Sequence, residues 1–243
     1  MTQLAGDHVQ ILVGGYELTG DSNQVTVNDA RAMLDSTTFA DAVQNFIPGR
    51  RNTSLEHAGF INPATGQSHP ALKSAELSGV VSVLLGQNAD PVVGDPVYCL
   101  KILQNRYSVN PQVGQVIPFS ATFNNVGEVS GWGAILAAPI AFTNSINGSS
   151  VDNGAQTIGG GAAHLHILQN AASDTYSIKV QGATDAGFTT GVVDLATFTL
   201  DASAIGSERI EISGTIPRYT RFMATRSGSA GDTVEIAVFL VRF

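Results

Sequence analysis

The chain has 243 residues, a formal net charge of −8, and a charged fraction of 13% beside a hydrophobic fraction of 43%. Soluble domains average roughly 25% charged residues, so this surface is poor in charge. Two explanations stay open: much of the surface faces other subunits, or the exterior is rich in Gly, Ser, Thr and Asn. The acidic balance and the lack of Lys or Arg runs argue against nucleic-acid binding through phosphate neutralisation.

The single cysteine, the first ten residues and the least polar segment argue against a disulfide-bonded, secreted or membrane-spanning protein. Cys99, the single cysteine, lies in the run PVYCLKIL, which excludes an intramolecular disulfide and predicts a small buried side chain. The first residues, MTQLAGDHVQ, contain no signal region, so we expect synthesis in the cytoplasm. Residues 131–146 are apolar but contain Pro139 and are shorter than the roughly 20 residues of a membrane-spanning helix. We expect them in the interior or between domains, with no membrane partner.

Strand patterns dominate the first 130 residues. The runs 9–13, 77–85, 97–103 and 116–123 are rich in β-branched and aromatic residues and are bounded by Gly, Pro, Asn or Asp. In 77–85 the apolar positions alternate with small or polar ones, as on a half-buried strand. The 26 glycines are spread over turn positions, which is typical of many short strands. These patterns predict an all-β fold.

One segment departs from this pattern, LDSTTFADAVQNFIPG at residues 34–49. Asp35, or one of the two hydroxyl residues after it, can accept backbone N–H bonds at a helix N-terminus. Apolar residues then recur at i, i+4 and i+7 or i+8, which predicts a short amphipathic helix packed on the sheet, ended by Pro48-Gly49. The candidate assembly residues of this segment are Leu34, Asp35, Phe39, Val43, Phe46 (or Ile47), Pro48 and Gly49.

The expected helix makes a prediction about Phe39. If Phe39 faces the sheet, Phe39→Asp buries an unpaired charge, costs several kcal/mol and prevents folding or assembly. A variant that assembles fully would contradict the helix.

The composition changes in the second half of the chain. Residues 144–161, NSINGSSVDNGAQTIGGG, are of low complexity and indicate a flexible loop or linker. Six strand-like runs follow at a spacing typical of a β-sandwich: HLHIL, DTYSIKVQGAT, VDLATFTL, SERIEISGTI, RYTRFMAT and DTVEIAVFLVRF. We therefore predict a β-sandwich or barrel domain at 1–135, a linker or loop at 136–160 and a second β-sandwich at 161–243.

Residues that could carry chemistry are few. His164 and His166 share one face of a strand, a spacing that can bind metal, but no acidic or Cys cluster accompanies them, so an exposed or inter-subunit face is favoured. No G-x-S-x-G elbow, Walker A loop or H-E-x-x-H motif occurs. Asp35 and Asp41 fit a helix cap and a solvated position better than a general acid–base pair. We expect a non-enzymatic protein with no catalytic residue, metal or cofactor.

A loose motif runs through residues 34–62, LDSTTFADAVQNFIPGRRNTSLEHAGFIN. It contains L-D-x-T-x-F-x-D, then P-G, then S-L-x-x-x-G-F at Ser54, Leu55, Gly59 and Phe60. This pattern resembles the tail tube proteins of long-tailed bacteriophages (siphophages), in which a helix covers the outside of a sheet and such a strand follows. The resemblance continues to FSATFNNVGEV at 119–129, covers about the first 130 residues, and adds Phe60 to the candidate assembly residues.

The C-terminal part is similar to accessory β-sandwich domains of phage virion proteins, through SDTYSIKVQGATD at 173–185 and GTIPRYTRFMATRSGSAGDTVEIAVFLVRF at 214–243. If RYTRF is a strand, Tyr219 and Arg221 share one face while Arg218, Thr220 and Phe222 share the other, so polar and apolar residues do not separate cleanly. The resemblance implies an outward-facing ornament, with weak adhesion to carbohydrate or host surfaces as one option. Arg218, Tyr219 and Arg221 are its candidate assembly residues.

Together these resemblances imply a structural virion protein of the phage tail. Rings, hexameric as in the family, would join sheets edge to edge and stack into a tube that guides the length-measuring protein and DNA without binding DNA specifically. Residues 21–32 and 62–75 are the candidates for contacts between rings. Two alternatives stay open: a capsid decoration or head fibre protein, and a carbohydrate-binding module, against which the single tryptophan, Trp132, argues.

Overall fold

The computed structural model describes residues 6–73, 78–87, 89–171, 173–229 and 231–243. Over these residues the strands form an 11-stranded and a 5-stranded sheet, both antiparallel, with one short α-helix, α1 (Ser68–Leu72). Single turns of 3-10 helix lie at Gly6–His8 and Thr19–Asp21. The predicted all-β fold with one short helix is confirmed, although the helix lies elsewhere than expected.

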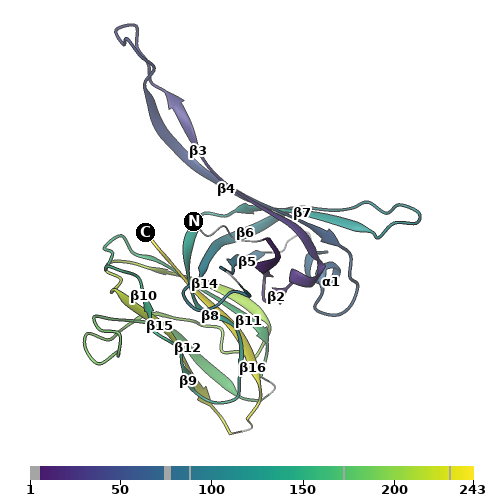
Figure 1. Ribbon diagram of the computed structural model, residues 1–243, viewed down its shortest axis with the longest axis vertical. Coiled ribbons are helices and arrows are strands. Elements are labelled where there is room, and N and C mark those ends of the chain that lie inside the picture. Colours follow the sequence, from purple (N-terminus) through teal and green to yellow (C-terminus); the bar gives the residue numbers. More distant parts are fainter. Residues whose placement is uncertain (1–5, 74–77, 88, 172, 230) are drawn as a thin grey trace.

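The chain divides into an N-terminal lobe, which contains β1 to β7, and a C-terminal lobe, which contains β9 to β16, with β8 between them (Figure 1). Each strand run predicted from the sequence contains a strand. The N-terminal strands are β1 (Val9–Val13), β2 (Tyr16–Glu17), β3 (Ser22–Asp35), β4 (Phe46–Phe60), β5 (Ser78–Leu85), β6 (Pro96–Val109) and β7 (Pro118–Asn125). The others are β8 (Gly131–Phe142), β9 (Ile146–Asn147), β10 (Val151–Asp152), β11 (Gly161–Gln169), β12 (Thr175–Ala183), β13 (Val193–Thr197), β14 (Gly206–Ile212), β15 (Tyr219–Ser227) and β16 (Val234–Arg242).

The strands stack in four layers with three apolar cores between them. The first core lies between β4 and β7 on one side and β1, β5 and β6 on the other. The second core separates β1, β5 and β6 from β8 and β16, and the third separates β8, β11, β14 and β16 from the 5-stranded sheet. Strand alternation specifies this stack: in β5, Val81 and Val83 enter the first core and Leu84 enters the second.

The 11-stranded sheet continues from one lobe into the other. Its order is β14-β11-β16-β8-β6-β5-β1-β2, and β7, β4 and β3 join it through β6. β8 pairs with both β6 and β16. The sheet therefore crosses the predicted boundaries at 135 and 161, and residues 136–160, predicted as a linker, contain more than half of β8 together with β9 and β10. The division into two domains stays a prediction.

The predicted helix at residues 34–49 is wrong. Leu34 and Asp35 end β3, and they pair with Ile47 and Phe46 at the start of β4. Pro48 and Gly49, expected to stop a helix, lie inside β4. Pro48 is tolerated there because this part of β4 has a partner strand on one side only. Phe39 consequently faces solvent, which removes the expected reason for Phe39→Asp to prevent folding.

The predicted exposed face for His164 and His166 is also wrong. Both side chains are buried, because β11 has packed layers on its two faces. His166 Nε2 lies 2.9 Å from Ser82 Oγ, and burial lowers the pKa of His166 to about 3. The predicted burial of Cys99 in a strand is confirmed, and burial raises the pKa of its thiol to about 12.

Candidate assembly surfaces

A long hairpin projects from the body and forms the most prominent feature of the molecule (Figure 1). β3 pairs with β4 from Ser22 to Asp35, but β4 pairs with β7 only from Ser54 onward. Residues 30–52, called the arm below, are therefore a two-stranded ribbon. A ribbon of two strands is marginally stable alone in water, so the arm is a segment that a partner would stabilise.

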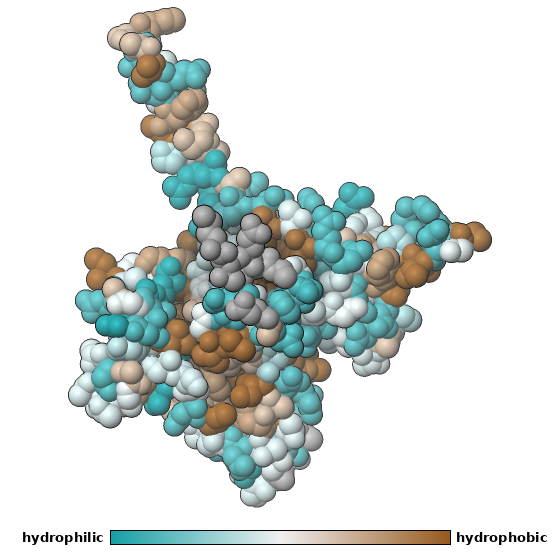
Figure 2. Space-filling model, viewed as in Figure 1, coloured by the Kyte–Doolittle hydropathy of each residue, from teal (hydrophilic) through white to brown (hydrophobic). Residues whose placement is uncertain are grey.

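The arm exposes large apolar side chains along its outer half. Phe39 is fully exposed and Val43 is 71% exposed. Figure 2 shows apolar atoms distributed along the arm among hydrophilic ones. Exposed apolar side chains gathered on one projecting element make the arm a candidate for contact with a partner. The exposed apolar residues of the arm are Met33, Leu34, Phe39, Val43, Phe46 and Ile47.

Two carboxylates give the tip, residues 36–45, a defined shape. Asp35 Oδ1 accepts bonds from the backbone N–H of Thr37 at 2.8 Å and from its hydroxyl at 2.5 Å. Asp41 Oδ2 accepts the equivalent bonds from Thr38, at 2.7 Å and 2.8 Å. These bonds lower the pKa of both carboxyl groups. The capping chemistry expected of Asp35 is therefore present, but it closes a turn that presents Phe39.

The base of the arm is fixed to the body by a polar network. The Arg51 guanidinium forms a bidentate pair with the carboxylate of Asp29 across the hairpin and donates from Nη1 to the Ser130 carbonyl at 3.0 Å. The Ser130 hydroxyl donates to Thr53 Oγ1 at 3.0 Å and accepts from Tyr98 at 3.3 Å. The pairing with Arg51 lowers the pKa of Asp29. The network orients the arm relative to the sheet.

A second hairpin, residues 104–122 of β6 and β7, projects in another direction (Figure 1). Its end also carries apolar surface (Figure 2). This surface was not predicted from the sequence, although the alternation of apolar residues with Gly, Pro and Gln in VNPQVGQVI was a usable signal. Its exposed apolar residues are Val109, Val113, Val116 and Ile117, of which Val113 is fully exposed.

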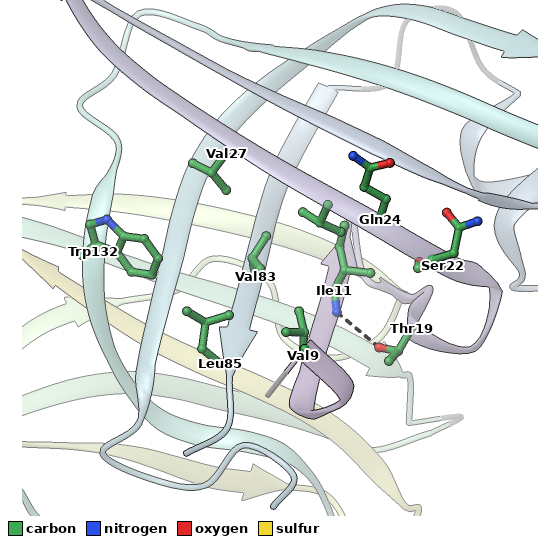
Figure 3. A pocket seen from close by; sticks show the side chains of 12 residues that line it. Val9, Ile11, Thr19, Ser22, Gln24, Val27, Val83, Leu85 and Trp132 are labelled. Carbon is green, nitrogen blue, oxygen red and sulfur yellow. Dashed lines mark hydrogen bonds between the residues drawn. The ribbon is translucent and has the colours of Figure 1, made fainter. Parts of the chain in front are cut away.

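A groove of about 420 Å³ lies between β3 on one side and β1 and β5 on the other (Figure 3). Trp132 lies at one end and Thr19 and Ser22 at the other, with Ile11 and Val83 between them. β3, which lines this groove, pairs with β4 alone among the described strands, so its other edge has no partner strand among them. An open edge of this kind can pair with a strand of another chain.

A smaller groove of about 310 Å³, called the lobe groove below, lies where the two lobes meet. The loop before β6 contributes Val92 and Val93, which are 57% and 38% exposed. β8 and β9 supply most of the remaining wall, and Phe222 of β15 closes it. None of its lining residues is charged: Pro91, Val92, Val93, Ala137, Ala138, Pro139, Ile140, Ile146, Asn147, Gly148, Ser149 and Phe222.

The structure separates the other predicted residues from the arm. Phe60 is exposed at the opposite end of β4, beside Pro118 of β7. Arg218 precedes β15 and pairs with Asp152, with Nη2 2.6 Å from Oδ2. Tyr219 and Arg221 share the outer face of β15 as predicted, whereas Thr220 and Phe222 are buried, so the two faces separate more cleanly than the sequence suggested.

The predicted inter-ring segments meet at the body end of the β3–β4 hairpin, away from the tip, and only residues 30–32 belong to the arm. Residues 21–32 contain most of β3, from its first residue, Ser22, onward. Of residues 62–75, those up to 73 are described and include α1, while 74 and 75 lie outside the described residues. The Ser68 backbone N–H at the start of α1 donates to Asp21 Oδ2 at 2.9 Å, so the two segments contact each other.

The described residues contain no group of three or more His, Cys, Asp or Glu side chains placed to hold a metal ion. Nor do they include a helix long and apolar enough to cross a membrane. His57, in the part of β4 that pairs with β7, is buried against Phe119, and burial lowers its pKa to about 4.

No family model matches the chain, and no curated protein matches it. Among solved structures it is similar to a chain of the virion of a native gene transfer agent (GTA) particle, at 9% identity and a TM-score of 0.41, over 52% of this chain and 96% of that one. It is similar to the SPP1 tail tube at 11% identity and 0.43, over 53% and 79%. The SPP1 Dit protein, described as a hub adsorption apparatus, aligns at 12% and 0.36, over 97% and 99%. All three TM-scores lie below 0.5, so we assign neither a fold family nor a function from them.

Proposed function

We propose that this chain is a non-enzymatic structural protein of a phage tail, which assembles with copies of itself into stacked rings that form a tube for DNA. The observation that carries this is the arm, a two-stranded ribbon whose exposed tip presents Phe39 and Val43. A protein that acted alone would expose this apolar surface without a partner. The second hairpin and the open edge of β3 provide further contacts for a multi-subunit assembly.

The small fraction of charged residues and the negative net charge both fit this function. A chain with 13% charged residues has a surface suited to many subunit contacts. A net charge of −8 repels a DNA phosphate backbone, so DNA can pass along such an assembly without binding tightly. The number of subunits in each ring is implied by the family resemblance alone, and we expect six. The C-terminal lobe would then face outward as an ornament.

Electron microscopy of the purified chain tests this function. After concentration, negative-stain images should show rings or tubes, and an antibody against the C-terminal lobe should label the tail of the virion along its length. A chain that stays monomeric at every concentration would contradict self-assembly. A trimer that adds to capsids, with label on the head, would instead establish the capsid decoration alternative.

A further inference from the structure

We propose that the tip of the arm of one copy docks in the lobe groove of the next copy. This docking presupposes the self-assembly proposed above and names the surface that receives the arm. The tip and the groove are two different surfaces of one chain, so their contact is head-to-tail. Head-to-tail contacts repeat from copy to copy and generate rings or open stacks rather than closed dimers.

The chemistry of the two surfaces matches. Phe39 and Val43 are the exposed apolar side chains of the tip, and the carboxylates of Asp35 and Asp41 are already engaged by N–H and O–H groups of the tip itself. The groove is walled by valine, isoleucine, alanine, proline and one phenylalanine, with no charged side chain among its lining residues. Docking therefore buries apolar surface on both copies without burying an unpaired charge.

The size of the lobe groove suits the tip. A closed cavity of roughly 150 Å³ accepts one benzene ring. The lobe groove, at about 310 Å³, has room for the ring of Phe39 and a neighbouring aliphatic side chain. Val92 and Val93 at its rim are exposed and would be covered by the incoming tip.

The positions of the two surfaces favour this groove over the larger one. The tip lies at one end of the long axis of the molecule, whereas β9, which lines the lobe groove, lies near the other end (Figure 1). A repeat along the long axis brings the tip of one copy towards the groove of the next. The groove beside β3 is walled by residues 22–27 at the base of the acceptor's own arm, where an incoming arm would meet it.

Cysteine cross-linking tests the contact directly. The chain's own thiol, Cys99, is buried, so cysteines introduced by Ala40→Cys and Val92→Cys are the accessible ones. Ala40 is exposed beside Phe39, and its substitution leaves the docking side chains Phe39 and Val43 in place. Oxidation of the assembled double variant should give a ladder of covalent multimers on a non-reducing gel. The matched control pairs Val92→Cys with Ile158→Cys, since Ile158 is 80% exposed on a loop of the C-terminal lobe. A ladder in the control alone, or in neither, would overturn the docking.

Mixing two blocked variants provides an independent test. The double variant Phe39→Asp, Val43→Asp places charges on the tip and should block its docking. The double variant Val92→Asp, Val93→Asp places charges at the rim of the lobe groove and should block the groove. Neither variant alone should therefore stack. The first keeps an intact groove and the second an intact tip, so a 1:1 mixture should form particles of twice the mass of either variant alone, measured by light scattering. Ile205→Asp, an exposed control outside the groove, should assemble as wild type does.

The outcomes distinguish the two proposals. If wild type assembles but the mixture shows no doubling of mass, the docking is wrong and self-assembly stands. If wild type itself never assembles, the proposed function fails, and the docking fails with it.

Discussion

Single side chains determine how firmly the arm is held by the body. Asp29 and Arg51 form an ion pair diagonally across the hairpin, where the two-stranded ribbon leaves the sheet. Arg51 also reaches the carbonyl of Ser130, which connects the arm to the turn before β8. The pair is partly exposed, so it contributes more to the direction of the arm than to the stability of the fold.

We predict that Asp29→Asn weakens assembly more than it weakens folding. The substitution removes the charge partner of Arg51 and should lower the free energy of unfolding by about 1 kcal/mol, the order expected for a partly screened pair. Urea unfolding measures the stability and light scattering the assembly. The control is Asp152→Asn, which breaks the exposed pair with Arg218 and should change neither quantity. Equal effects of both substitutions would contradict a role for Asp29 in placing the arm.

The buried histidines predict a dependence of stability on pH. The folded pKa values of His57 and His166 are about 4 and about 3, below the ordinary value of 6.5, because burial disfavours the charged ring. The unfolded chain therefore binds more protons below pH 6.5. The neutral buried histidines do not reduce the free energy of unfolding above pH 6.5. As pH falls from 6.5 towards the folded pKa values, the free energy of unfolding decreases by about 1.4 kcal/mol per pH unit for each histidine.

Urea unfolding at pH 7.5, 6.5, 5.5 and 4.5 measures this slope. His166→Gln keeps a polar group beside Ser82 but introduces no group that titrates. The free energy of unfolding should therefore fall less between pH 6.5 and 4.5 than in wild type, by about the decrease that one buried histidine causes. An unchanged slope would show that His166 is protonated or exposed in the folded chain.

The arm is the element that projects furthest from the body, and hydrogen bonds within its tip determine the shape of that tip. Among the described residues its outer strands have no third strand to pair with, and a ribbon of two strands is marginally stable alone in water. The bonds of Asp35 and Asp41 restrain the backbone of the tip, which would reduce the entropy lost in the docking proposed above.

We predict that Phe39→Asp folds normally but does not stack. The side chain is fully exposed, so its free energy of unfolding should stay within about 0.5 kcal/mol of wild type, as is usual for surface substitutions. Phe123→Asp is the matched control, because Phe123 is buried in the first core and a charge there should prevent folding. A Phe39→Asp chain that fails to fold would contradict the exposed tip.

The sequence was informative about strands and misleading about this arm. The run 9–13, rich in β-branched residues, predicted β1 with its observed bounds, because such residues pack well in a strand that is buried on both faces. Asp35 was predicted to cap a helix, and the same bond to a backbone N–H closes a turn instead. Sequence patterns cannot distinguish the two, since what decides is whether a sheet covers Phe39. The burial of His164 and His166 was missed because it depends on a layer from the other lobe.

At the scale of the whole molecule, the second core joins the lobes. It combines residues of β1, β5 and β6 with residues of β8 and β16, among them Phe239. A chain cut after residue 135 would expose the N-terminal side of this core to water. Each lobe therefore contributes to the stability of the other through the second core.

We predict that the two lobes unfold together. Phe239→Ala should lower the free energy of unfolding by about 3–5 kcal/mol, because it opens a cavity in the shared core. Urea curves followed by the fluorescence of Trp132, on β8, and by circular dichroism should coincide in one transition. Two separate transitions, only one of them shifted by the substitution, would show that the lobes fold independently.

The central claim is that this chain assembles through its arm, and comparing particle mass between wild type and Phe39→Asp at equal high concentration tests it most directly. Sedimentation velocity should give large, concentration-dependent particles for wild type and a smaller species, a single copy or an unstacked ring, for the folded variant. Assembly of the variant to the same particles as wild type, or wild type that sediments as a monomer throughout, would contradict the claim.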